Sequence, residues 1–158
     1  MEYNLDLFLN EHGLKQLPTR GEGDCLFYAL QTMLPELLGG MDVDDIRNNV
    51  VRHLRNLIKD NVEVTTRTVN DNLADILNRQ IRLSEWINNH EDSSWDVYYD
   101  NMSRPGTYAD DPCLWAASSL FNIEITVYVS NRTIQIFSPS WEANVPSVKI
   151  SIGNYDQH

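Results

Sequence analysis

The stretch Gly21-Glu22-Gly23-Asp24-Cys25-Leu26-Phe27-Tyr28-Ala29-Leu30 places a cysteine between a glycine-rich turn and an apolar segment. Apolar residues follow the cysteine at steps of three or four, the spacing of one buried helix face. They are Leu26, Ala29, Leu30, Met33 and Leu34. We therefore expect Cys25 at the N-terminus of a helix, where unpaired N–H groups and the positive end of the dipole favour a thiolate.

The glycines before the cysteine predict a second property of this turn. Because Gly21 and Gly23 lack a Cβ, the backbone can approach a substrate carbonyl closely and direct N–H groups at a developing oxyanion. We expect the backbone around Gly23, Asp24 and Cys25 to supply these donors. The whole stretch is therefore typical of a nucleophilic cysteine.

The same segment resembles the signature of the ovarian-tumour (OTU) cysteine proteases, a papain-like family of deubiquitinases. The family pattern is Asp-Gly-x-Cys-Leu-Phe/Tyr-x-Ala, and this chain reads Glu22-Gly23-Asp24-Cys25-Leu26-Phe27-Tyr28-Ala29. Glu22 stands where the family usually has Asp, a residue that shapes the oxyanion loop. The resemblance thus implies that Cys25 is the nucleophile and that Glu22 belongs to the catalytic machinery.

Two downstream segments extend the resemblance. Gly106-Thr107-Tyr108-Ala109-Asp110 matches a Gly-Thr-Tyr/Trp-x-Asp stretch that opens a helix in OTU domains. The resemblance implies that Gly106, Thr107 and Tyr108 lie near the channel for the Gly-Gly tail of ubiquitin; for Tyr108, packing in the core is an equal alternative. A last strand, Val148–Ile152, leads to His158 in the place of the family's catalytic histidine.

A cysteine thiol with a pKa near 8.5 needs a base at neutral pH, and an imidazole can take its proton and return it to the leaving amine. Of the four histidines, His12 is expected at a helix end, His53 on a solvent-facing helix surface, and His90 at a helix C-terminus. His158 is the candidate for the base. The residue that orients it is Glu22, Asn154 or Asp156, or it lies beyond the chain end.

Composition narrows the class of protein. A chain of 158 residues predicts one domain, residues 1–158. A net charge of -11 argues against nucleic-acid binding and would suit the basic tail of ubiquitin, although simple solubility is the plainer explanation.

The two cysteines, Cys25 and Cys113, are not preceded by a signal peptide, and no long apolar run suggests a membrane partner. We expect free thiols in the cytoplasm, or in the host cytosol for a viral or pathogen protein, with Cys113 as a small core residue.

The periodicity predicts helices followed by strands. The expected helices are Asp42–Lys59, Val69–Ile76, Leu83–Ile87, Ser94–Tyr99 and one that runs from Asp110 or Asp111 to Phe121. Alternation predicts strands over Ile123–Val129, Thr133–Phe137 and Val148–Ile152. The predicted fold class is α+β. The resemblance makes it a papain-like OTU fold with helices packed on a small antiparallel sheet.

The predicted activity is that of a thiol deubiquitinase whose partner is ubiquitin, polyubiquitin or a ubiquitin-like modifier. It would be a monomer that needs no metal or cofactor. Two alternatives stay open. One is a catalytically weak or inactive ubiquitin-binding module, and the other is a viral-type cysteine protease that releases itself from a polyprotein.

Overall fold

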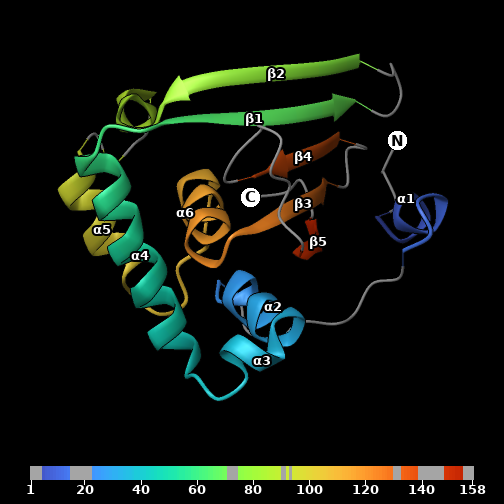
Figure 1. Ribbon diagram of the computed structural model, residues 1–158, viewed down its shortest axis with the longest axis horizontal. Coiled ribbons are helices and arrows are strands. Elements are labelled where there is room, and N and C mark those ends of the chain that lie inside the picture. Colours follow the sequence, from blue (N-terminus) through green and yellow to red (C-terminus); the bar gives the residue numbers. More distant parts are fainter. Residues whose placement is uncertain are drawn as a thin grey trace.

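A computed structural model describes residues 5–14, 23–70, 75–89, 92, 94–129, 133–138 and 148–154. The helical elements are α1 (Leu5–Glu11), α2 (Cys25–Met33), α3 (Pro35–Leu38), α4 (Val43–Lys59), the 3₁₀ helix η1 (Leu83–Asn89), α5 (Trp95–Met102) and α6 (Asp111–Phe121). The strands are β1 (Glu63–Asn70), β2 (Asp75–Arg82), β3 (Ile123–Val129), β4 (Thr133–Phe137) and β5 (Val148–Asn154). Most of the helices, α2 to α6, gather on one face of a single twisted sheet, whereas α1 packs on the other face through Phe8 and Leu9 (Figure 1).

Within the described residues the sheet has five strands in the order β2-β1-β4-β3-β5. The pairs β1–β2, β1–β4 and β3–β4 are antiparallel, whereas β5 runs parallel to β3, with Ile150 opposite Ile125. Helix α6 lies between α4 and the sheet, and α2 contacts both α4 and β5 (Figure 1). The α+β class is confirmed, and the sheet is mixed because its last strand is parallel.

Helix α4 confirms the expectation for Asp42–Lys59. The Asp42 side chain accepts a hydrogen bond from the Asp44 N–H at 2.8 Å and so caps the helix. The apolar stripe forms the central core, because Ile46, Val50 and Leu54 are fully buried. Helices α2, α5 and α6 all pack against this helix.

The expectation of a helix over Val69–Ile76 is wrong. The two ends of this range belong to the antiparallel strands β1 and β2, in which Val69 pairs with Ile76. The hairpin extends past the rest of the sheet (Figure 1), and its described side chains are half-buried or exposed rather than alternating. Strands therefore also occur in the middle of the chain, and the helices do not all precede them.

The second half of the chain agrees with the sequence. Strand β3 alternates between buried and half-buried residues, and helix α6 follows Asp110 and ends at Phe121. Cys113 is fully buried in the core, and Trp115 packs edge-on against Phe137 at 5.7 Å between ring centroids. Among the described residues, no helix is both long and apolar enough to cross a membrane.

Candidate active site

Helix α2 begins at Cys25, as the sequence predicted. The N–H groups of Phe27 and Tyr28 donate to the Asp24 carbonyl at 3.0 and 3.1 Å, which closes the first helical turn. Cys25 is a free, half-buried cysteine, whereas Cys113 is buried. The arrangement places an accessible thiol at the positive end of a helix dipole.

The buried face of α2 differs in part from the predicted stripe. Leu26, Phe27 and Leu30 are buried, but Met33 is 40% exposed. Phe27 belongs to the buried face instead, and the Arg47 guanidinium lies over its ring, 4.5 Å from the centroid. The very end of the helix, at Met33, is open to solvent, whereas Leu30 is fully buried and Gln31 donates to the Met41 carbonyl at 2.6 Å.

Gly23 is required for a reason that the sequence did not reveal. Its φ is 78°, in the left-handed region, and an ideal Cβ at this position would lie 1.7 Å from the carbonyl oxygen of Gly106. The close approach is therefore between two segments of the protein itself. It brings the turn before Cys25 against the Gly106-Thr107-Tyr108 loop, which is distant in the sequence.

Asp24 joins the same two segments with hydrogen bonds. Its Oδ1 accepts from the Gly106 backbone N–H at 2.9 Å and from the Arg47 guanidinium at 2.6 Å. Burial alone would raise the pKa of this carboxyl, but the Gly106 N–H and the Arg47 charge outweigh it and hold the pKa below its ordinary value. Asp24 is therefore a carboxylate at neutral pH.

Arg47 is the residue of this site that sequence reasoning missed. It projects from α4, its side chain is 0% exposed, and it also donates to the Gly23 carbonyl at 3.0 Å and the Met102 carbonyl at 2.9 Å. A signal for it exists in the sequence, because Arg47 falls within the apolar stripe of α4, four residues after Val43 and three before Val50. A charged residue in such a stripe must find buried partners.

The predicted substrate loop is held at its base and exposed at its tip. Thr107 Oγ1 donates to the Asn101 carbonyl at 2.9 Å, whereas Tyr108 is 52% exposed. Packing in the core, one of the two alternatives for Tyr108, is therefore wrong. Because Gly106 touches Gly23, this exposed ring belongs to the loop beside the nucleophile turn.

Asp110 precedes α6, but it does not cap the helix with its side chain. Its carboxylate accepts a hydrogen bond from the Tyr98 hydroxyl, which also lies 3.7 Å from Cys113 Sγ. Burial raises the pKa of the Cys113 thiol to about 12, with the Asp110 charge adding to the effect. Cys113 is thus a buried core residue, in agreement with the expectation.

The described histidines make contacts within the fold. His12 follows α1 next to Gly13, which has a φ of 72°, and its ring packs against Phe8 and Tyr128. The solvent-facing position expected for His53 is wrong: it is half-buried, and its Nε2 lies 2.9 Å from Ser119 Oγ.

Several residues of the expected site lie outside the described part of the chain. These are Gly21, Glu22, His90, Asp156 and His158. The backbone of Asn154 is described as the last residue of β5. Strand β5 contacts α2, so the sheet edge that leads toward residue 158 is next to the nucleophile helix.

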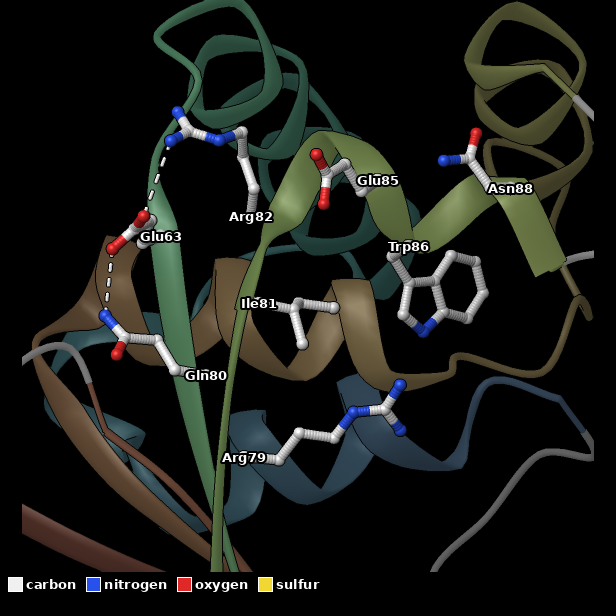
Figure 2. A pocket seen from close by; sticks show the side chains of 8 residues that line it. All are labelled: Glu63, Arg79, Gln80, Ile81, Arg82, Glu85, Trp86 and Asn88. Atoms are coloured by element: carbon white, nitrogen blue, oxygen red, sulfur yellow. Dashed lines mark hydrogen bonds and ion pairs between the residues drawn. The ribbon is translucent and has the colours of Figure 1, made fainter.

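A separate hollow lies over the end of the β1–β2 hairpin and η1 (Figure 2). Glu63 in its wall accepts a hydrogen bond from Gln80 at 2.9 Å and pairs with Arg82 at 3.4 Å, on side chains that are largely open to solvent. Exposed pairs of this kind contribute little because solvent screens them. None of the residues that line the hollow belongs to the nucleophile turn.

A half-buried thiol at a helix start, on an α+β scaffold with a mixed sheet, is the arrangement expected of a cysteine hydrolase. Comparison of the sequence with protein families gives a match to the family described as "OTU-like cysteine protease" over residues 20–152. The chain belongs to this family. The predicted resemblance is therefore confirmed.

Individual proteins agree with this assignment. The chain is 26% identical over 141 residues to a Tipula iridescent virus protein named "Putative ubiquitin thioesterase L96", covering 85% of this chain and 14% of that protein. This chain thus spans about one seventh of the length of that relative.

Two solved structures share the fold. The OTU domain of OTUD1 matches with a TM-score of 0.57 at 15% identity, over 94% of this chain and 83% of that one. The viral OTU domain protease from Dera Ghazi Khan virus matches with a TM-score of 0.52 at 15% identity, over 91% and 75%.

Proposed function

We propose that this chain is a deubiquitinase that hydrolyses the isopeptide bond after the C-terminal glycine of ubiquitin. The observation that carries the proposal is the contact between the turn before Cys25 and the Gly106 loop. It sets an accessible thiol at a helix N-terminus beside a loop whose exposed tip is Tyr108. The viral relative named as a ubiquitin thioesterase supports ubiquitin as the substrate.

In the proposed reaction, His158 takes the proton of Cys25, and the thiolate attacks the carbonyl carbon of the terminal glycine. The backbone N–H groups of the nucleophile turn stabilise the oxyanion, and the imidazolium protonates the departing lysine amine. Water then attacks the thioester, with the imidazole as base, which releases ubiquitin and restores the thiol. The contact between α2 and β5 supports a partner that follows β5.

The test uses a ubiquitin probe with an electrophilic C-terminus and a panel of di-ubiquitins. We expect the parent chain and Cys113→Ala to form a covalent adduct and to cleave at least one linkage, and Cys25→Ala to do neither while still binding ubiquitin. Binding without adduct formation by the parent chain would instead indicate a non-catalytic ubiquitin-binding module. Cleavage by Cys25→Ala at the parent rate would refute the assignment of the nucleophile.

A further inference from the structure

The strongest unexplained feature of the molecule is a buried charge under the nucleophile turn. Arg47 is 0% exposed, and burial of a cation is costly unless partners replace its water. Its guanidinium donates to the Gly23 carbonyl, the Met102 carbonyl and the Asp24 carboxylate. Two of these three acceptors are on the residues that immediately precede Cys25. The cation therefore acts on the turn and not merely on the core.

Asp24 occupies the N-cap position of α2 without capping it. Aspartate is among the most favourable N-caps, because its carboxylate accepts from the N–H groups of the first turn. Here the backbone of Asp24 has a φ of -99° and a ψ of 5°, and its side chain makes no cap hydrogen bond. The carboxylate is instead directed to Arg47 and to the Gly106 N–H.

The alternative orientation would harm the proposed chemistry in two ways. A capping carboxylate would place a negative charge beside the Cys25 sulfur, which disfavours the thiolate. It would also bond the N–H groups at the second or third position of α2, and so weaken the positive potential that the mechanism directs at the oxyanion. A residue that holds Asp24 away from the helix would therefore protect the nucleophile.

We propose that Arg47 is a positioning residue that holds the Asp24 carboxylate off the N-terminus of α2 and ties the nucleophile turn to the Gly106 loop. The inference rests on the proposed role of Cys25 as nucleophile. Arg47 does not touch the reacting atoms in this scheme; it acts through Asp24. Loss of Arg47 releases a carboxylate that then competes for the helix N-terminus.

The test is a double-mutant cycle on the ionisation of Cys25. Rates of alkylation by iodoacetamide are measured against pH, with the modified peptide identified by mass spectrometry, in the parent chain, Arg47→Met, Asp24→Ala and the double variant. The midpoint of each curve of alkylation rate against pH gives the apparent pKa of the Cys25 thiol. We expect Arg47→Met to raise this midpoint by about one pH unit or more, and Asp24→Ala to lower it. We expect the Arg47→Met shift to be at least halved in the Asp24→Ala background, because no carboxylate remains to be released.

An equal Arg47→Met shift in both backgrounds would overturn the proposal, since Arg47 would then act only through its own charge. No shift in either background would overturn it as well. Arg52→Met is the matched control, because Arg52 is an exposed arginine on the same helix, and its midpoint should equal that of the parent. If Arg47→Met does not fold by circular dichroism, Arg47→Gln takes its place in both backgrounds, with the same outcomes.

The readout separates this inference from the proposed function. Alkylation reports the thiol alone and needs no ubiquitin, whereas the deubiquitinase assignment is read from the ubiquitin probe on the parent chain. If the parent chain does not react with the ubiquitin probe but shows the expected coupling between Arg47 and Asp24, only ubiquitin as the substrate is rejected. Normal probe labelling with no coupling would reject only the role of Arg47.

Discussion

Gly23 and Gly106 lie in direct backbone contact, so that a Cβ on Gly23 would stand 1.7 Å from the Gly106 carbonyl oxygen. We expect Gly23→Ala to lower adduct formation with the ubiquitin probe at least tenfold. The φ of 78° adds strain of roughly 1–2 kcal/mol for any residue with a Cβ. Thermal unfolding and probe labelling measure the two effects.

Two glycines provide graded controls for this substitution. Gly13 has a φ of 72° but nothing within 4 Å of the place that a Cβ would take, and Gly40 has open space without a positive φ. Gly13→Ala should therefore cost about 1 kcal/mol without loss of labelling, and Gly40→Ala should change neither property. Parent-like labelling by Gly23→Ala would contradict the importance of the contact.

The two cysteines should differ sharply in reactivity. Burial raises the pKa of Cys113 to about 12 and shields its sulfur, so brief iodoacetamide treatment at neutral pH should modify Cys25 alone. Peptide mass spectrometry of the folded chain gives the ratio directly, and modification in denaturant shows that both thiols can react. Equal labelling of the folded chain would contradict the buried position of Cys113.

Tyr108 should contribute to substrate binding without supporting the fold. Because its ring is 52% exposed, Tyr108→Ala should leave the melting temperature within experimental error. Loss of an aromatic contact to the ubiquitin tail should raise KM about fivefold, equivalent to ~1 kcal/mol, with a smaller effect on kcat. Val97→Ala, at a position 47% exposed on α5, is the control and should have parent kinetics.

His53 should make stability depend on pH. Burial lowers its pKa below the ordinary value of 6.5, so the unfolded chain binds the proton more readily than the folded one. The contribution of His53 to stability is therefore complete above pH 6.5 and is lost as the pH falls through the lower folded pKa. In urea titrations between about pH 7.5 and about pH 5, the free energy of unfolding should fall less for His53→Gln than for the parent chain.

If the net charge of -11 helps to attract a basic ubiquitin tail, association should depend on salt. Screening shortens the Debye length from about 30 Å at 0.01 M to about 8 Å at physiological ionic strength, so the on-rate for ubiquitin should fall between these conditions. Stopped-flow measurements with the Cys25→Ala variant avoid turnover. An on-rate that does not change with salt would indicate that the net charge serves solubility and not the attraction of ubiquitin.

The sequence was sufficient to predict a helix or strand where its hydrophobic pattern fits only one type of element. The apolar stripe of Asp42–Lys59 and the alternation of Ile123–Val129 each match a single type of element, and both expectations are confirmed. The β1–β2 hairpin was missed because its described residues show no clean alternation between a buried and an exposed face. Its enrichment in β-branched residues, from Val64 to Val69, was the available signal.

The site was predictable only in its local part. The start of α2 at Cys25 follows from the glycine turn and the apolar spacing, which are both short-range. The Arg47–Asp24 pair and the Gly23–Gly106 contact join residues that are distant in the chain, and no local pattern specifies which partner a buried arginine or a tight glycine meets. Such pairings depend on the assembled fold.

The parallel pairing of β5 with β3 has a consequence for the order of assembly. The other strand pairs of the described sheet form among residues 63–137, whereas β5 is an edge strand that must return across the sheet from residue 148. During synthesis the nucleophile helix, α4 and the strands β1 to β4 can be in place while the strand that contacts α2 is still in the ribosome. A nascent chain would therefore carry its thiol for a time before the neighbouring strand arrives.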